Sequence, residues 1–282
     1  MINDVPTFVK WAGGKKQLLP QFRSLFPRKI TTYIEPFLGS GAVFFYLKKH
    51  YNIKNAILSD INEELINCFQ MVRDKPDALI KLLKEHKTKR SKPYYYKIRL
   101  LNPKDLSDIQ RASRLIYLNK TCFNGLYRVN SKGQFNVPIG SYKNPDIVSE
   151  LKIRKANMLL KDTTIKCMPF TQIESVAKAG DFIYFDPPYY PISKTSGFTS
   201  YTENGFMENE QRQLAELFKR LDKKGCLLML SNSNSGFIIS LYKGFDIKLV
   251  DAKRVINCDA TKRGNIKELL ITNYRVGKQT KL

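Results

Sequence analysis

The sequence predicts an α/β protein with a doubly wound, mostly parallel sheet that is interrupted by a mainly helical insertion. In the first and last parts of the 282-residue chain, short apolar runs that end in acidic or turn residues alternate with helical patterns. In the middle part, the apolar residues keep helical spacing and lack the alternation of strands. Strands that alternate with helices pair mostly in parallel, with the helices on both faces of the sheet.

The first strand, helix and strand are expected at 32–37, 42–49 and 55–60, where the apolar runs TYIEPF and NAILSD flank a helical pattern. A second set follows the insertion. Its expected strands lie at 180–190, 226–231, 245–250 and 268–274, and its expected helix at 208–221.

The insertion is expected to span 73–161. Helical spacing occurs at 76–86, 94–100 and 106–117. Residues 124–142 are rich in Gly, Asn and Pro, which is typical of a loop or a hairpin.

The charge of the chain is concentrated in this insertion. The whole chain has 48 Lys and Arg against 25 Asp and Glu, a net charge of +23, and residues 73–161 hold 21 basic and 7 acidic residues. A solvated Lys-rich surface is one interpretation. Aromatic residues between the basic ones favour binding to a polyanion with unstacked bases. These aromatic residues are Tyr94, Tyr95, Tyr96, Tyr117, Phe123, Tyr127, Phe135 and Tyr142.

Composition excludes several classes of protein. No apolar run approaches the roughly 18 residues of a membrane span, and the first residues lack the apolar stretch of a signal peptide, so a soluble, cytoplasmic protein is expected. The five cysteines form no CxxC pair and are expected to be buried thiols. His50 and His86 lie among lysines and are expected at the surface, so neither a metal site nor a His-based triad is predicted.

A glycine turn follows the first expected strand in the segment EPFLGSG, residues 35–41. Gly39 and Gly41 allow a tight turn and close approach of a ligand to the backbone, with free amide groups at the helix start behind them. A GxG pattern alone equally fits a plain turn. Asp60 at the end of the next strand favours the ligand interpretation, because a carboxylate there typically binds ribose hydroxyls.

The segment FVKWAGGK, residues 8–15, contains the only tryptophan of the chain. Trp11 fits a core anchor followed by a turn. It also fits an aromatic wall over a cofactor, with Lys15 paired to a carboxylate.

The most specific motif is the apolar strand FIYF followed directly by DPPY, residues 186–189. Two prolines end the strand and fix the backbone at the carboxyl edge of the sheet, where such folds bind ligands. Methylation of an exocyclic amine suits these groups. Asp186 and the Pro187 carbonyl can hold the two N–H groups of an adenine N6 amine, while Tyr189 stacks on the base.

Four motifs in this order, FVKWAGGK, YIEPFLGSGAVFF, LSDINEELIN and FIYFDPPY, resemble those of the Dam-type family of DNA adenine-N6 methyltransferases. The resemblance covers nearly the whole chain. It implies a methyltransferase (Rossmann-like) domain made of residues 1–72 and 162–282, and a target-recognition domain at 73–161 with its hairpin at about 123–142. It further implies S-adenosylmethionine as the cofactor, no metal, and adenine in double-stranded DNA, usually within GATC, as the substrate.

The resemblance also assigns residues to the cofactor and to catalysis. Trp11, Lys15, Asp60 and Asp186 match cofactor-contacting positions of the family. The full set of candidates for cofactor binding is Phe8, Trp11, Ala12, Gly13, Gly14, Lys15, Glu35, Phe37, Gly39, Ser40, Gly41, Asp60, Ile61, Phe170 and Asp186, and the catalytic candidates are Asp186, Pro187, Pro188 and Tyr189.

Two segments of the insertion, FNGLYR at 123–128 and QFNVPIGSY at 134–142, resemble the family's DNA-recognition hairpin. By this resemblance Arg128 reads a guanine, for which its bidentate geometry is suited, and Phe123 and Asn124 fill the space of an extruded adenine. The candidates for DNA contact are Lys10, Phe123, Asn124, Leu126, Arg128, Asn136, Pro138 and Tyr142.

One position departs from the family. Relatives often carry an acidic residue just before Phe170 to bind the adenine amine of the cofactor, and this chain has Pro169 there. Phe170 is still expected to stack on that adenine.

Other functions stay open at this stage. The same chemistry fits another DNA site or RNA, although the hairpin resemblance argues against RNA. Methylation of a protein amide is disfavoured by Asp186, where such enzymes usually show Asn. A DNA-binding regulator on an inactive scaffold is disfavoured by the intact DPPY and GSG motifs and by Asp60. Pairing with a restriction endonuclease is possible, and a monomer is expected because transfer needs only one active site.

Overall fold

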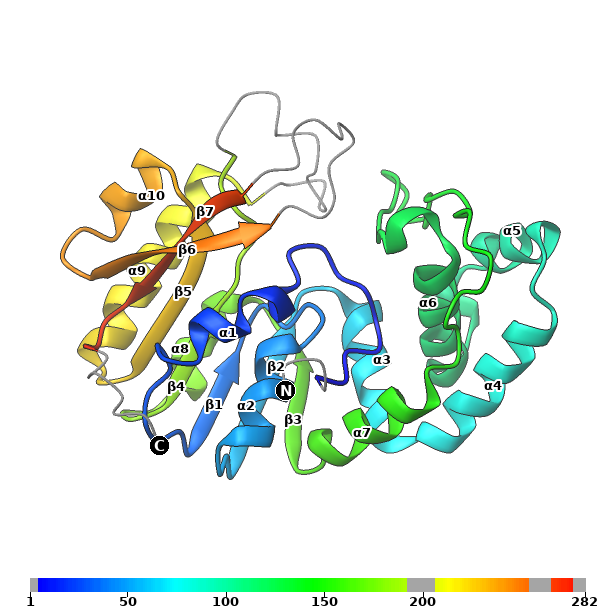
Figure 1. The fold of residues 1–282 in the computed structure, drawn as a ribbon, viewed down its shortest axis with the longest axis horizontal. Coiled ribbons are helices and arrows are strands. Elements are labelled where there is room, and N and C mark those ends of the chain that lie inside the picture. Colours follow the sequence, from blue (N-terminus) through cyan, green and yellow to red (C-terminus); the bar gives the residue numbers. More distant parts are fainter. Residues whose placement is uncertain (1–4, 192–205, 254–264, 276–282) are drawn as a thin grey trace.

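The computed structural model describes residues 5–191, 206–253 and 265–275. Its centre is a seven-stranded sheet with the order β3-β2-β1-β4-β5-β7-β6 (Figure 1). The first five strands in the chain pair in parallel, and β7 is antiparallel to both of its neighbours. The mostly parallel sheet predicted from the sequence is therefore confirmed. The strands are β1 Thr32–Glu35, β2 Asn55–Asp60, β3 Thr163–Cys167, β4 Phe182–Phe185, β5 Leu227–Ser233, β6 Asp246–Lys253 and β7 Asn265–Thr272.

The sheet has one topological switch point, between β1 and β4. Strand β1 pairs with β2 on one side and with β4 on the other, so the chain is wound outward in both directions from this place. Ligands of such sheets bind beyond the carboxyl ends of the strands at the switch point. The residues that follow β1 and β4 are therefore neighbours although about 150 residues separate them in sequence.

Both faces of the sheet are covered by buried side chains. Tyr33 and Tyr184 belong to the core on one face, and Ile34 and Ile183 belong to a second core that includes Phe218 of α9. All four residues of β4 are buried, as expected for a central parallel strand. The helices of this part are α1 Leu19–Phe22, α2 Ala42–His50, α3 Glu63–Asp74, α8 Ile173–Val176, α9 Glu208–Lys223 and α10 Gly236–Leu241, with short 3₁₀ turns η2 Lys15–Gln17 and η5 Phe170–Gln172.

The predicted insertion folds as helices on one side of the sheet (Figure 1). They are α4 Pro76–Thr88, α5 Lys92–Leu100, α6 Asp108–Thr121 and α7 Glu150–Leu160, with 3₁₀ turns η3 Pro103–Asp105 and η4 Phe123–Gly125. Local signals start them: Ser91 accepts a hydrogen bond from the Tyr94 N–H, and the Ser107 N–H donates to Gln110.

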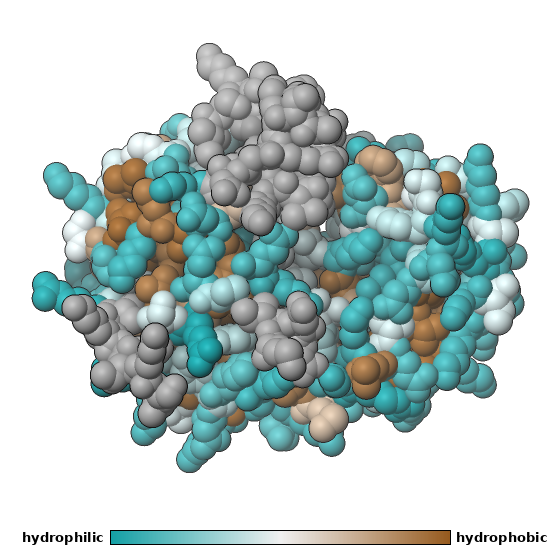
Figure 2. Space-filling view, viewed as in Figure 1, coloured by the Kyte–Doolittle hydropathy of each residue, from teal (hydrophilic) through white to brown (hydrophobic). Residues whose placement is uncertain are grey.

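Helix α3 joins the insertion to the sheet. It packs against α4, α6 and α7 as well as against β2 and β3. Phe69 of α3 and Leu115 of α6 belong to the same buried cluster as Tyr33 of β1. The helices therefore share a continuous hydrophobic core with the sheet. Hydrophilic side chains cover most of the outer face over these helices (Figure 2).

Residues 122–139 return on themselves as an antiparallel hairpin. Isolated bridges join Cys122 to Ile139 and Val129 to Phe135. The Asn130 N–H donates to the Gln134 carbonyl at 2.9 Å and closes the tip. The sequence allowed either a loop or a hairpin at 124–142, and the structure shows a hairpin.

Two expectations for single residues were wrong. Cys167 is exposed, whereas Cys68, Cys122 and Cys226 are buried as expected, and Cys258 lies outside the described residues. His86 is half-buried, because its ring stacks on that of Tyr117 with centroids 4.8 Å apart and its Nδ1 forms a hydrogen bond with the Tyr94 hydroxyl. Among the described residues, no helix is long and apolar enough to cross a membrane.

Candidate active site and nucleic-acid interface

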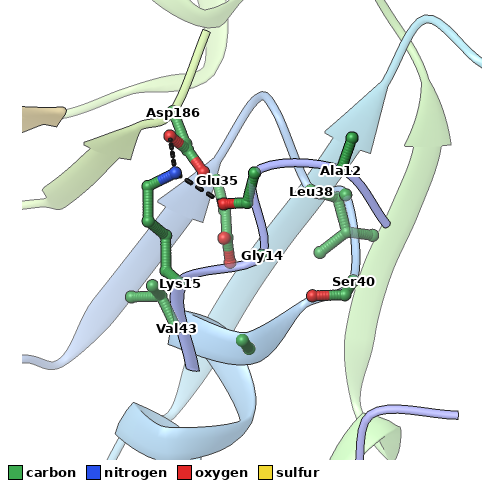
Figure 3. A pocket seen from close by; sticks show the side chains of 11 residues that line it. Ala12, Gly14, Lys15, Glu35, Leu38, Ser40, Val43 and Asp186 are labelled. Atoms are coloured by element: carbon green, nitrogen blue, oxygen red, sulfur yellow. Dashed lines mark hydrogen bonds and ion pairs between the residues drawn. The ribbon is translucent and has the colours of Figure 1, made fainter. Parts of the chain in front are cut away.

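The candidate site lies at the switch point of the sheet. The glycine turn follows β1, the DPPY motif follows β4, and the amino-terminal loop, residues 8–15, closes over them (Figure 3). A pocket is formed between these three segments. Its lining consists of Ala12, Gly13, Gly14, Lys15, Glu35, Leu38, Gly39, Ser40, Ala42, Val43 and Asp186. Of these, Leu38, Ala42 and Val43 were not candidates from the sequence.

An ion pair joins the amino-terminal loop to the DPPY motif. The Lys15 Nζ lies 2.8 Å from Asp186 Oδ1 and also donates to the Gly13 carbonyl at 2.6 Å (Figure 3). The Lys15 side chain is 5% exposed and that of Asp186 18%. Burial raises the pKa of the Asp186 carboxyl to about 6, although the Lys15 ammonium acts to lower it. The sequence-based pairing of Lys15 with a carboxylate is thus observed.

Glu35 contributes a second carboxyl group to the pocket. It ends β1 and is 2% exposed, and its Oε2 has no hydrogen-bond partner among the described residues. Burial holds the pKa of this carboxyl well above its usual range, and the neighbouring Asp186 adds to the rise. A buried acceptor without a partner is costly, so this oxygen suits a cationic or hydrogen-bond-donating ligand.

The glycine turn is shaped by its neighbours. Gly39 has φ +48°, and a Cβ there would lie 3.1 Å from Trp11 Cδ1, so only glycine fits without strain. The Gly39 N–H donates to Asp60 Oδ2 at 3.2 Å, and the Asn62 N–H donates to Asp60 Oδ1 at 3.0 Å. Asp60 therefore holds the turn in place at the end of β2. Burial raises its pKa, against the effect of these two donors.

Two cofactor candidates lie behind the pocket. Phe8 is fully buried, with its ring 4.7 Å from that of Phe69. Gly41 has φ +67°, and a Cβ there would lie 3.1 Å from the Phe69 ring. Both residues support the wall and neither lines the pocket.

Three other cofactor candidates lie beyond the glycine turn. Phe37 stacks on Phe170 with ring centroids 5.4 Å apart, and Phe206 meets the edge of Phe37 at 5.6 Å. Phe206 also contacts Phe170, with ring centroids 5.5 Å apart, and Phe170 is only 8% exposed, so its ring is largely covered by protein. Ile61 is 59% exposed, and its carbonyl accepts from the Cys167 thiol.

The DPPY motif presents groups of different exposure. Pro187 is buried and Pro188 is exposed. The Tyr189 hydroxyl donates to Glu268 Oε2 at 2.7 Å, and the Lys15 ammonium lies 4.7 Å from the centre of the Tyr189 ring. Glu268 was not found from the sequence, because its distance of 79 residues from Tyr189 leaves no local signal.

Most candidates for DNA contact lie on the hairpin. Phe123 is 49% exposed, Asn124 follows it with φ +54°, and Arg128 and Pro138 are exposed. The Arg128 Nε donates to Asn136 Oδ1 at 2.7 Å, so these two candidates face each other across the hairpin. Leu126 is half-buried.

The amino-terminal loop is fixed to the hairpin as well as to the sheet. Asn119 accepts from the Lys10 N–H at 2.8 Å and donates to the carbonyls of Lys10 and Gly125. The Lys10 ammonium reaches the Tyr142 hydroxyl at 3.2 Å, and Trp11 stacks on Tyr127 with centroids 5.3 Å apart. The candidate cofactor residues and the candidate DNA residues therefore form one connected unit. Asn119 was missed because Lys10, which shares two of its three hydrogen bonds, is 109 residues away in sequence.

Comparisons with known proteins show to which family the chain is similar. The D12 class N6 adenine-specific DNA methyltransferase family matches residues 11–256. The Type II methyltransferase M.MjaIII of Methanocaldococcus jannaschii is 47% identical over 96% of this chain and 100% of its own length. The Type II methyltransferase M1.LlaDCHI of Lactococcus lactis subsp. cremoris is 45% identical over 95% of each chain, and the DNA adenine methylase of Haemophilus influenzae is 36% identical over 93% of this chain and 92% of its own.

The chain belongs to the D12 class of N6 adenine-specific DNA methyltransferases. It is accordingly an enzyme that methylates adenine in DNA. Among the described residues, no group of three or more His, Cys, Asp or Glu side chains is placed to hold a metal ion.

The Asn119 side chain should be important for stability. Asn119→Ala removes three hydrogen bonds at a residue that is 1% exposed and leaves backbone groups of Lys10 and Gly125 without partners. We expect a loss of about 2–3 kcal/mol in the free energy of unfolding, measured by urea denaturation. The exposed Asn52→Ala serves as the control. A loss below about 0.5 kcal/mol for Asn119→Ala would contradict the assignment.

Proposed function

We propose that the enzyme transfers a methyl group from S-adenosylmethionine to N6 of an adenine within GATC in double-stranded DNA, after extruding that adenine from the helix. The observation that carries the proposal is the ion pair between Lys15 and the half-buried Asp186 carboxylate, both of which line the pocket at the switch point. The family membership of the chain supports the adenine N6 chemistry.

The residues of the pocket fit S-adenosylmethionine. Its ammonium and sulfonium groups are cationic, and the pocket holds the unpartnered Glu35 oxygen beside Asp186. Gly39 lets the backbone approach a ligand closely, and Asp60 at the end of β2, which accepts from the Gly39 N–H, is proposed to bind ribose hydroxyls as well. When bound, S-adenosylmethionine supplies an electrophilic methyl group on its sulfonium sulfur.

Asp186 and Pro187 are proposed to activate the adenine amine. The N6 lone pair is delocalised into the ring, and it becomes nucleophilic when both N–H groups are held by acceptors in tetrahedral geometry. The ionised Asp186 carboxylate accepts one N–H and the Pro187 carbonyl the other. Tyr189 stacks on the extruded base from a ring fixed by Glu268. Transfer is direct, and no covalent enzyme intermediate is needed.

Residues 73–161 are proposed to form the target-recognition domain. Their excess of basic over acidic residues attracts the DNA backbone, and the hairpin reads the site. In this assignment the Arg128 side chain gives up its hydrogen bond to Asn136 and contacts a guanine. Leu126, Asn136 and Pro138 contact neighbouring bases. Lys10 and Tyr142 contact the outer guanine. Phe123 and Asn124 replace the lost stack of the extruded adenine, which offsets part of the few kcal/mol that extrusion costs.

The Type II names of two relatives support a partnership with a restriction endonuclease that cuts the same sequence. A monomer suffices for this function, because all the proposed catalytic and DNA-contacting residues belong to one chain.

Removing the Asp186 carboxylate should separate chemistry from binding. Asp186→Ala is expected to abolish methyl transfer and to leave the affinity for duplex DNA within about threefold, since the DNA contacts are assigned elsewhere. Transfer is measured with labelled cofactor, and DNA affinity by fluorescence anisotropy. Asp246→Ala, at an exposed carboxylate on β6, is the matched control. Full activity of Asp186→Ala would refute its catalytic role.

The rate should depend on the ionisation of Asp186. Its carboxyl must be deprotonated to accept an N–H, so single-turnover rates should rise with pH through a midpoint near pH 6, and they should level off about one pH unit above it. Lys15→Met removes the group that lowers this pKa, and its midpoint should move to higher pH. The exposed Lys29→Met should leave the midpoint unchanged. An identical pH profile for Lys15→Met and the wild type would contradict the mechanism.

Arg128 should determine specificity at one base pair. Arg128→Ala is expected to reduce discrimination at that pair by about 1–3 kcal/mol and to affect other positions little. Relative kcat/KM on duplexes with single substitutions in GATC measures this. Lys132→Ala, at an exposed position of the same hairpin, should weaken all duplexes equally. Equal losses for Arg128→Ala on every duplex would instead make it a phosphate contact.

A further inference from the structure

Two fully buried amide side chains lie directly behind the DPPY motif. Gln211 of α9 and Asn232 of β5 both have 0% exposure. Burying an uncharged polar side chain is unfavourable unless each polar atom finds a partner. Neither residue belongs to the pocket lining, and neither is explained by the proposed chemistry.

The two amides form a relay that ends on the backbone of the motif. The Gln211 Nε2 donates to the Pro188 carbonyl at 2.9 Å. The Asn232 Nδ2 donates to Gln211 Oε1 at 2.9 Å, and Asn232 Oδ1 accepts from the Tyr190 N–H at 3.2 Å. The Ser233 N–H also donates to Asn232 Oδ1, at 2.8 Å, which fixes the orientation of the Asn232 amide.

The relay fixes the backbone on both sides of Tyr189. The Pro188 carbonyl belongs to the peptide group before Tyr189, and the Tyr190 N–H belongs to the peptide group after it. The Tyr189 hydroxyl is held independently by Glu268. Backbone and ring tip are thus both held, which fixes the direction of the long axis of the ring.

The relay also distinguishes the two carbonyls of the motif. Gln211 occupies the Pro188 carbonyl. Within the described parts of the chain, no donor is hydrogen-bonded to the Pro187 carbonyl. Gln211 therefore engages the Pro188 carbonyl, whereas the Pro187 carbonyl has no donor among the described residues.

We propose that Gln211 and Asn232 are positioning residues for methyl transfer: their relay holds the Pro188 carbonyl and the Tyr190 N–H so that the Pro187 carbonyl and the Tyr189 ring meet the target amine in reactive geometry. This inference rests on the proposed function of the DPPY motif. Neither residue touches the substrate. Their effect on the reaction is geometric, and displacement of a reacting group by about 1 Å can lower a rate by about a hundredfold.

Two substitutions of Gln211 test the relay. Gln211→Met preserves the size of the side chain but removes both its donor and its acceptor. We expect kcat to fall roughly tenfold or more, with KM for duplex and cofactor within about twofold. The Tm should fall by a few degrees, because the buried Asn232 amide and the Pro188 carbonyl lose a partner, so kcat is measured well below the Tm. Gln213→Met, at an exposed position of the same helix, is the matched control and should retain the wild-type kcat.

Gln211→Glu gives a signature that a merely structural role would not produce. Its protonated carboxyl can donate to the Pro188 carbonyl and accept from Asn232, whereas its ionised form can only accept. The ratio of its kcat to that of the wild type should therefore fall as pH rises from about 6 to about 9. Gln213→Glu should show a constant ratio. The pH profile of Gln211→Glu also tests the positioning role of the relay if Gln211→Met does not fold.

The proposal is overturned if Gln211→Met keeps kcat within about twofold, if its loss lies in KM alone, or if Gln211→Glu keeps the wild-type pH profile. Failure of the proposed function is a different result, in which the wild-type protein itself transfers no methyl group to DNA. If the wild type is active and the Gln211 variants are fully active, only the positioning role of the relay is refuted.

Discussion

The ion pair between Lys15 and Asp186 is the interaction on which the rest of the site depends. It links the amino-terminal loop to the end of β4 across the switch point, and both side chains are mostly removed from water. In such surroundings a carboxylate without a partner would tend to be protonated and could not accept a hydrogen bond. Lys15 opposes this tendency, and it holds the loop against the motif that is proposed to carry the chemistry.

The same loop connects the chemistry to the hairpin. Its backbone is bound by Asn119, and the Trp11 ring lies between the Gly39 turn and Tyr127. The groups assigned to the cofactor and those assigned to DNA are thus parts of one packed structure. On the far side of the DPPY motif, Gln211 and Asn232 give equivalent support from α9 and β5.

The sequence predicted many parts of this structure whose signals are local, although helix α3 was not among the expected elements despite its capping Asn62. Strand ends, the glycine turn and the DPPY corner are defined by neighbouring Gly, Pro and acidic residues, and eight of the eleven pocket residues were candidates. Strand β3 was missed because its exposed residues include Lys166 and Cys167, so it lacks the apolar run of a central strand. Four residues could not be found because they act through contacts with other elements of the fold, and an isolated amide or carboxylate gives no pattern in the sequence. They are Asn119, Gln211, Asn232 and Glu268. Phe8 and Gly41 fit the motif, but their packing on Phe69 is visible only in three dimensions.

The most direct test of the account is tritium transfer from labelled S-adenosylmethionine to two matched duplexes, one with a single GATC and one with that site scrambled. The account predicts that label enters only the GATC duplex and is recovered as N6-methyladenine. Equal label on both duplexes would contradict the proposed specificity while leaving the chemistry intact. Label on neither duplex, from a protein that binds the cofactor, would contradict the proposed function itself.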